Sequence, residues 1–216
     1  MRILLLGATG RTGKIILDKA LGDGDKVTAI ARDKSKLEGT NADIIEGTPY
    51  NKATVVAAIK GCEAVVSTLN VSRKTDSPWA KLRSPKDLIS RSVQNAVESM
   101  KENNIKRIIV LSTLGAGDSR EKMPLLFNLF ISMTNLRYAF KDHTRQEEIL
   151  AQSGLDWTVI RLPMLTNDEG ENEVIVNMND GKKLNRNVNR ETVARFILNI
   201  INEEKYFKKI IAISNK

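Results

Sequence analysis

Hydrophobic and polar positions along the chain form two alternating kinds of segment. Short apolar runs are typical of strands that are buried on both faces of a parallel sheet. Longer segments between them carry apolar residues at helical spacing, with polar residues on the opposite face. The predicted strands are 3–6, 26–31, 43–46, 64–68, 107–111, 157–162 and 209–214, with a smaller one at 173–177. The predicted helices run from the first glycine turn to about residue 21, and over 52–59, 87–103, most of 123–153, and 190–202.

This order predicts an α/β protein with a Rossmann-type, doubly wound parallel β-sheet that carries helices on both faces. The connections are short and the composition does not change along the chain, so residues 1–216 are expected to form a single domain. The segment 71–86 has no clear period and contains two prolines, which is typical of a functional loop or a disordered one. Trp79 in this segment either covers a bound ring or pins the loop. Ser84 or Asp87 is expected to cap the helix that follows.

A glycine turn carries the strongest chemical signal. Gly7-Ala-Thr-Gly-Arg-Thr-Gly13 begins directly after the first strand and leads directly into a helix. Glycines allow a tight turn and let a pyrophosphate approach the backbone, and the helix N-terminus offers free N–H groups and a partial positive charge. A glycine triplet alone is weak evidence, but in this context it predicts a site for nucleotide phosphates.

The residue after the second strand decides which dinucleotide is expected. An acid there binds the ribose 2′-hydroxyl of NAD, whereas an Arg accommodates the 2′-phosphate of NADP. Arg32 holds this position, and Arg11 in the glycine turn can approach from the other side. Asp33 keeps NAD open, because a strand one residue longer would make it the ribose acid. We predict NADP(H), with NAD(H) as the less favoured alternative.

Composition and charge exclude several other classes of protein. The net charge of +8 arises from 34 Lys and Arg spread among 26 acids, with no basic arm, so a solvated surface is expected rather than nucleic-acid binding. The single cysteine, Cys62, allows no intrachain disulfide and fits a reducing compartment. No apolar run is long enough for a membrane helix. We therefore expect a cytoplasmic protein without membrane contact, and we predict no metal site.

Hydroxyl and apolar side chains indicate where a substrate would lie. Ser112 and Thr113 follow the strand 107–111, at the mouth of the sheet where a nicotinamide and a substrate are expected. Residues 124–134 begin the long helix and are apolar nearly all round. Such a helix is buried, lines a pocket, or meets a protein partner or a second copy of the chain.

Several motifs together resemble one known family. These are the glycine turn, Arg32, Leu111-Ser-Thr113, Glu147 with the stretch Leu150-x-x-Ser-Gly-Leu-x-Trp-Thr-x-x-Arg-Leu-Pro163, and Asn189-Arg-Glu-Thr-Val-Ala194. The chain resembles, almost end to end, the atypical short-chain dehydrogenase/reductases, specifically the NAD(P)H-binding, NmrA-like group that includes the flavin/biliverdin-IXβ reductases. The resemblance implies a Rossmann fold that binds NADP(H), with a small-molecule acceptor above the nicotinamide.

The resemblance also implies the site residues. The substrate pocket is expected to be formed by 69–86, 112–140 and 163–188. The expected cofactor contacts are Gly7, Thr9, Gly10, Arg11, Thr12, Gly13, Arg32, Thr48, Thr68, Leu69, Ser112 and Pro163. The candidates for catalysis are Thr113, Ser112 and His143, the only histidine, although a lone histidine is more often structural.

Two departures from the family limit what can be carried over. Standard members use a Tyr-x-x-x-Lys pair, which is absent here, and Tyr138 and Lys141 are only three residues apart. Many relatives carry an Asp after the third strand where this chain has Thr48. Flavins, quinones and linear tetrapyrroles accept a hydride and then a proton from solvent, so they need no Tyr–Lys pair. An apolar wall at Leu125, Phe127 and Phe130 would suit them.

Three functions remain open at this point. The favoured one is an NADPH-dependent reductase of a flat conjugated acceptor. The alternative is a non-catalytic NADP sensor of the NmrA-like type, which acts on a protein partner. An S-adenosylmethionine methyltransferase shares the glycine turn but would want an acid where Arg32 stands.

Overall fold

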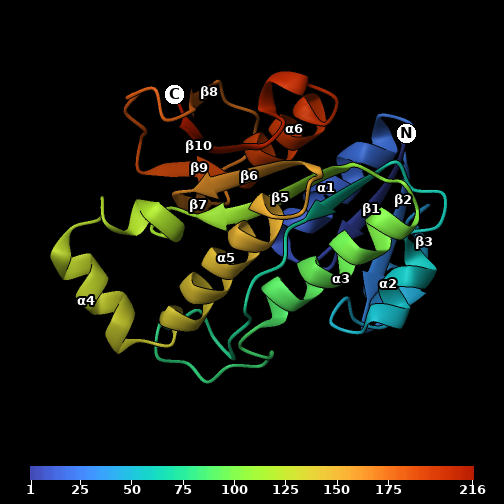
Figure 1. Ribbon diagram of the computed structural model, residues 1–216, viewed down its shortest axis with the longest axis horizontal. Coiled ribbons are helices and arrows are strands. Elements are labelled where there is room, and N and C mark those ends of the chain that lie inside the picture. Colours follow the sequence, from blue (N-terminus) through green and yellow to red (C-terminus); the bar gives the residue numbers. More distant parts are fainter.

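The computed structural model describes residues 1–216 and is built on an eight-stranded sheet with helices on both faces (Figure 1). The strand order is β3-β2-β1-β4-β5-β6-β10-β8. All neighbouring strands are parallel except β8, which pairs antiparallel with β10. The strands of this sheet are β1 (Arg2–Leu6), β2 (Lys26–Ala31), β3 (Asp43–Glu46), β4 (Ala64–Ser67), β5 (Arg107–Thr113), β6 (Asp156–Leu162), β8 (Val174–Asn177) and β10 (Lys209–Asn215). The predicted doubly wound Rossmann-type sheet is confirmed.

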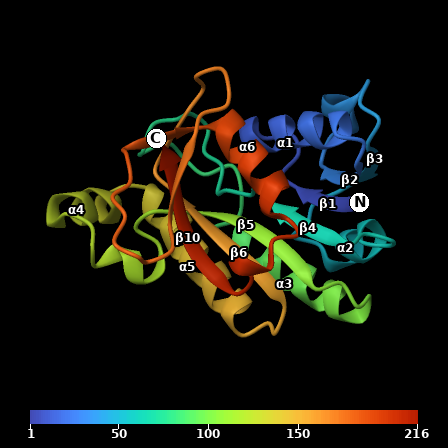
Figure 2. The same ribbon diagram turned by 90° about the horizontal axis from the view of Figure 1, so that it is seen from above.

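Two layers of helices bury the two faces of the sheet (Figure 2). On one face lie α1 (Arg11–Gly22) and α6 (Arg190–Ile200), which pack against each other. On the other lie α2 (Lys52–Ala58), α3 (Leu88–Glu102) and α5 (Leu136–Ala151). Because side chains alternate along a strand, neighbours on β1 belong to different cores: Leu5 packs with α1 and α6, whereas Leu4 packs with α2 and α3. This double burial explains why the strands are continuous apolar runs.

The strand order reverses direction beside β1. From β1 the chain proceeds to β2 and β3 on one side, and then returns to β4, β5 and β6 on the other. In open α/β sheets a ligand binds in the crevice outside the carboxyl ends of the strands at this reversal. The connections after β1 and β4 therefore frame the expected site.

The predicted helix over 123–153 is two helices in the structure. α4 (Leu125–Met133) ends at Thr134, whose backbone is extended (φ −112°, ψ 169°), and α5 begins at Leu136. Asn135 holds the break, because its N–H donates to the carbonyl of Pro78 and its side-chain amide donates to the carbonyl of Trp79. The sequence prediction was wrong here because contacts with a distant loop interrupt the helix.

Two short strands were not predicted. β7 (Met164–Thr166) and β9 (Asn187–Asn189) pair with each other in a separate two-stranded sheet. Each has only three residues, too few to show a period of two.

The N-terminus of α3 is capped by neither predicted residue. Asp87 occupies the N-cap position but makes no capping hydrogen bond, and the hydroxyl of Ser84 accepts from the N–H of Ser72. The carboxylate of Asp142 on α5 instead accepts from the N–H groups of Ile89 (2.7 Å) and Ser90 (3.1 Å). The cap comes from a helix about fifty residues further along the chain, which no local motif reveals.

α4 extends away from the body of the protein (Figure 1). Four of its apolar side chains are more than half exposed: Leu125, Leu126, Leu129 and Met133. Trp79 packs edge-on against Phe130, with 5.8 Å between ring centroids, so it joins the loop 71–86 to α4. Self-association or partner binding through 124–134 stays a prediction. No helix combines the length and the apolar character needed to cross a bilayer.

Candidate functional site

A cleft of about 770 Å³ opens at the carboxyl ends of β1, β4, β5 and β6. This volume lies in the range of small-molecule and cofactor sites, roughly 300–1,000 Å³. All the site residues expected from the sequence line this one cleft: Gly7, Thr9, Gly10, Arg11, Thr12, Gly13, Arg32, Thr48, Thr68, Leu69, Ser112, Thr113, His143 and Pro163. The topology thus brings together residues from seven separate parts of the chain, while their contacts with a cofactor stay a prediction.

The glycine turn is shaped partly by the protein's own packing. Gly7 has φ +93°, and a Cβ there would lie 2.7 Å from the hydroxyl of Thr68. A Cβ at Gly13 would lie 2.1 Å from the carbonyl oxygen of Gly7. These two glycines are required for the turn and for the close approach of α1 to β1.

Gly10 is less crowded than Gly7 and Gly13. Its φ and ψ (−81°, 163°) suit any residue, and a Cβ would meet only the carbonyl oxygen of Gly7, at 3.2 Å. The fold would therefore accommodate a Cβ at Gly10 more easily than one at Gly7 or Gly13, and Gly10 lines the cleft.

The N-terminus of α1 is uncapped and suits an anion. No side chain caps it, and its first turn contains no acidic residue. The N–H groups of this turn have no intrahelical partners and lie at the positive end of the helix dipole. Together with the space at Gly10, this arrangement fits a diphosphate.

Arg32 stands alone where β2 reaches the cleft. β2 ends at Ala31, so Arg32 directly follows the strand, where it is exposed and makes no hydrogen bond or ion pair with the protein. The carboxylate of Asp33 is hydrogen-bonded within its own turn, because its Oδ1 accepts from the N–H (3.1 Å) and the hydroxyl (2.6 Å) of Ser35. The hydrogen bond from the Ser35 hydroxyl also lowers the pKa of Asp33.

Further arginines line the cleft that the sequence analysis did not select. Arg73 comes from the loop 71–86, and Arg190 is the first residue of α6. Burial lowers the pKa of Arg190, and the nearby charge of Arg11 lowers it further. Arg11 also forms an exposed ion pair with Asp76, at 3.1 Å, which brings the loop to the glycine turn. Arg190 lies in the Asn189–Ala194 motif noted above, and Arg73 lies in the segment 69–86 that was expected to form part of the substrate pocket, so the sequence indicated both segments without selecting either arginine.

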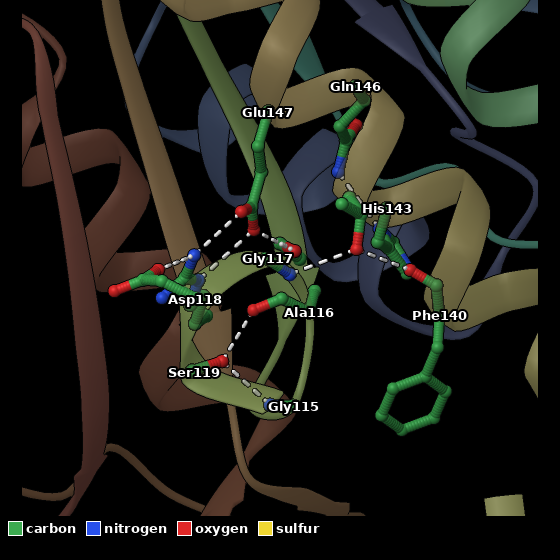
Figure 3. Close-up of polar contacts among 12 residues, drawn as sticks. Gly115, Ala116, Gly117, Asp118, Ser119, Phe140, His143, Gln146 and Glu147 are labelled. Carbon is green, nitrogen blue, oxygen red and sulfur yellow. Dashed lines mark hydrogen bonds and ion pairs between the residues drawn. The ribbon is translucent and has the colours of Figure 1, made fainter. Parts of the chain in front are cut away.

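Of the two hydroxyls beside the expected nicotinamide position, one is firmly hydrogen-bonded to the protein and the other is not. Ser112 is buried and donates to Glu147 at 2.7 Å. Glu147 also accepts two hydrogen bonds from Arg161, whose guanidinium bonds Asp118 in turn (Figure 3). The hydroxyl of Thr113 makes only a long bond of 3.3 Å, to the carbonyl of Leu114. Thr113 is therefore the freer of the two hydroxyls.

His143 is buried on α5 and lines the cleft. Burial lowers its pKa to about 4, so its imidazole is neutral near pH 7. A neutral ring can donate a hydrogen bond but is a poor source of a proton. The only hydrogen bond of the ring within the protein is with Gln146, which was not selected from the sequence (Figure 3).

Thr68 and Thr48 support the backbone as well as line the cleft. The hydroxyl of Thr68 donates to the carbonyls of Leu6 and Gly7, each at 3.3 Å. The hydroxyl of Thr48 accepts from the N–H of Tyr50, at 3.3 Å. Both side chains stabilise the turns that follow β1 and β3.

The apolar wall expected from the start of the long helix is not part of this cleft. Of 112–140 only Ser112 and Thr113 line it, and Leu125, Phe127 and Phe130 do not. Phe127 packs against Phe140, with 6.2 Å between ring centroids, and Leu125 is directed to solvent. Tyr138 and Lys141 also lie outside the cleft lining.

Comparisons with known proteins agree with this geometry. The model of the family described as NAD(P)H-binding matches residues 7–204. The photosystem II assembly factor Ycf39 of Synechocystis is 28% identical over 90% of this chain, and the match spans 60% of that protein's length. A short-chain dehydrogenase/reductase of Veillonella parvula in complex with NADP has a TM-score of 0.79 at 18% identity, covering 99% of this chain and 94% of that one. The anaerobillin reductase ChuY of Escherichia coli has a TM-score of 0.79 at 20% identity, covering 100% and 97%.

Proposed function

The chain belongs to the NAD(P)H-binding family, and on this premise we propose that it is an NADPH-dependent reductase of a flat conjugated acceptor such as a flavin, a quinone or a tetrapyrrole. This family match confirms the resemblance to NAD(P)H-binding proteins that the sequence motifs indicated. The choice of NADPH, the acceptor class and the reaction are the parts that we propose.

One observation carries the choice of cofactor: Arg32 is free at the end of β2, while the neighbouring Asp33 is held by Ser35. A guanidinium binds a phosphate monoester through two parallel N–H donors. Both hydrogen bonds from Ser35 go to Oδ1 of Asp33 and direct this carboxylate toward its own turn, whereas no protein group directs Arg32 away from the cleft. These two facts favour a 2′-phosphate over a free hydroxyl.

The groups around the cleft favour an acceptor that takes its proton from water. The bound dinucleotide would supply a hydride. The chain offers no obvious proton source beside it, because Ser112 is committed to Glu147 and His143 is neutral. The residues therefore orient the reactants and do little acid–base work, which suits conjugated acceptors. The structural likeness to a reductase named for anaerobillin is in keeping with this class.

Replacing Arg32 tests the cofactor. Arg32→Ala is expected to weaken NADPH binding by about 2 kcal/mol, roughly thirtyfold, and to leave NADH binding nearly unchanged. Lys36→Ala is the matched control, since Lys36 is also exposed and follows β2 but does not line the cleft. Equal losses for both dinucleotides with Arg32→Ala would show that Arg32 does not bind the 2′-phosphate.

Turnover tests the reaction. NADPH oxidation is followed at saturating cofactor with flavins, quinones and biliverdin, each with and without the protein. The reductase proposal expects at least one acceptor to be consumed at a rate proportional to protein concentration. Flat traces with every acceptor, from protein that binds NADPH, would contradict it.

The exposed apolar face of α4 supports a second candidate, a non-catalytic NADP(H) sensor that acts on a protein partner. A sensor of this kind would bind its dinucleotide without turnover, and a partner would bind differently to the free and the loaded protein. Turnover in the acceptor panel would exclude it.

A further inference from the structure

Gln146 and His143 lie one turn apart on α5 and share a hydrogen bond beside the cleft (Figure 3). The amide nitrogen of Gln146 is 2.9 Å from Nδ1 of His143. Neither residue carries a charge at neutral pH, because the glutamine amide is neutral and burial keeps the imidazole in its neutral form with a single proton. The position of the single imidazole proton therefore decides whether the ring offers a donor or an acceptor to the cleft.

The orientation of the Gln146 amide follows from its second partner. Its nitrogen, Nε2, also lies 2.8 Å from the carbonyl oxygen of Leu111 on β5. A carbonyl only accepts, so the amide nitrogen has to face it. Rotating the amide by half a turn would place two carbonyl-type oxygens 2.8 Å apart. The amide oxygen of Gln146 is buried and has no partner, which is the cost of keeping this orientation.

With the amide held in this way, both of its N–H groups are used as donors. One bonds the carbonyl of Leu111 and the other bonds Nδ1 of His143. Nδ1 must then accept and cannot carry a proton. The proton of the neutral ring is consequently on Nε2.

The other side of the ring faces the cleft. Nε2 of His143 has no hydrogen-bond partner in the protein. It is also absent from the set of fully buried polar atoms without a partner, so part of this nitrogen is exposed. His143 itself lines the cleft. The nearest acids on the same helix are engaged elsewhere, Asp142 with the N-terminus of α3 and Glu147 with Arg161 and Ser112.

We propose that Gln146 is a positioning residue that holds His143 in its Nε2–H form, so that the imidazole presents a hydrogen-bond donor to an oxygen of the ligand in the cleft. The part concerning the ligand rests on the proposed function, since the oxygen belongs either to the dinucleotide or to the acceptor. The tautomer itself depends only on the protein.

The consequence is a donor whose state does not change across neutral pH. A histidine near its ordinary pKa would switch between one donor and two. Here the proton on Nε2 stays in place, so His143 polarises or orients a ligand oxygen and does not deliver a proton to it.

Nuclear magnetic resonance of the imidazole tests this inference directly. The chain contains one histidine, so in ¹⁵N-labelled protein without a histidine tag every imidazole signal belongs to His143. The expected result is a single neutral form with Nε2 protonated and Nδ1 unprotonated from pH 6 to pH 8. A protonated Nδ1 in this range would overturn the inference.

Two variants test whether Gln146 sets the tautomer. Gln146→Glu replaces the donor with an acceptor and is expected to place a proton on Nδ1, either as the Nδ1–H form or as the imidazolium. Gln146→Met removes the donor at similar size and is expected to allow both neutral forms. Gln152→Met is the control, because Gln152 is the exposed C-cap residue of the same helix, and it should leave the spectrum unchanged. An unchanged Nε2–H form in a folded Gln146 variant would show that Gln146 does not set it.

Ligands then identify the oxygen. NADP⁺ is added first, with binding verified independently by thermal shift, and flavin mononucleotide second. A change in the Nε2–H signal with NADP⁺ assigns the oxygen to the dinucleotide, and a change only with the flavin assigns it to the acceptor. Bound ligands that leave the signal unmoved would overturn the donor role. Failure to bind either ligand would refute the proposed function, while the tautomer of the free protein would still decide the role of Gln146.

Discussion

The first turn of α1 crosses Gly7 so closely that a Cβ at Gly13 would lie 2.1 Å from the Gly7 carbonyl oxygen. This atom belongs to the backbone of a turn that is packed against Thr68, so it cannot move aside without disturbing β1 and β4. A Cβ at Gly10, three residues earlier, would meet the same oxygen at the looser distance of 3.2 Å. We therefore predict different purposes for the two glycines, Gly13 for the fold and Gly10 for the ligand.

Alanine at each glycine separates these purposes. Gly13→Ala is expected to lower the free energy of unfolding by about 2 kcal/mol or more, because overpacking against backbone forces a shift. Gly10→Ala should cost less than about 1 kcal/mol of stability and yet weaken NADPH binding at least tenfold, about 1.4 kcal/mol. Urea denaturation and fluorescence titration measure the two effects. Undiminished NADPH binding by Gly10→Ala would mean that no phosphate lies against this turn.

Asp142 is expected to stabilise α3 from outside that helix. Its carboxylate serves the N–H groups of Ile89 and Ser90, so Asp142→Ala should cost about 2 kcal/mol in urea denaturation. Asp87→Ala is the control, since Asp87 holds the N-cap position without capping, and it should change stability by less than about 0.5 kcal/mol. The reverse order of the two losses would show that the local residue is the effective cap.

The buried pair of Glu147 and Arg161 should show strong coupling. Glu147→Met leaves the guanidinium of Arg161 buried with only the exposed Asp118, and we expect a loss of about 3–5 kcal/mol. The double variant Glu147→Met/Arg161→Met should recover part of this loss, because no uncompensated charge remains. Removing Glu98 from its exposed pair with Lys52 should cost less than about 1 kcal/mol. Additive losses in the double variant would contradict the coupling.

His143 makes stability depend on pH in a defined direction. Its pKa is about 4 in the folded protein and 6.5 in the unfolded chain, so between these values only the unfolded chain binds the proton. The stabilisation is complete above pH 6.5, and roughly 3 kcal/mol is lost as the pH falls to about 4.

His143→Gln isolates this contribution, because the carboxyl groups that titrate in the same window are common to both proteins. The difference in free energy of unfolding between the two proteins, measured in urea at pH 7.5 and pH 4.5, should shrink at the lower pH. A difference that does not vary with pH would show that His143 is not buried in its neutral form.

Much of the site follows from local pattern. The glycine turn, Arg32 and Ser112 come directly after predicted strands and Thr68 ends one, and parallel strands deliver their carboxyl ends to one edge of the sheet. The alternation of strands and helices was therefore enough to predict that these residues share a cleft. The end of β2 at Ala31 also agrees with the predicted strand.

Other features depend on contacts between distant segments. The prediction that Phe127 and Phe130 form a wall of the cleft was wrong, because Phe127 packs against Phe140 and Phe130 against Trp79, away from the cleft lining. Arg73 lines the cleft from the segment 69–86, which the sequence placed in the substrate pocket without singling out this residue. The hydroxyl of Ser112 was a free candidate in the sequence and is committed to Glu147 in the structure.

The sequence by itself determined the order of the main strands and most of the helices, the glycine turn and the basic residue after the second strand, because burial on both faces and glycine geometry leave their marks in neighbouring residues. Only the tertiary structure decided which polar atoms are free to act. The carboxylate of Asp33 accepts from Ser35, and the hydroxyl of Ser112 donates to Glu147. The amide of Gln146, oriented by the carbonyl of Leu111, places the imidazole proton of His143. A buried polar atom needs a hydrogen-bond partner, and that partner is a group close in space, which is often far away along the chain.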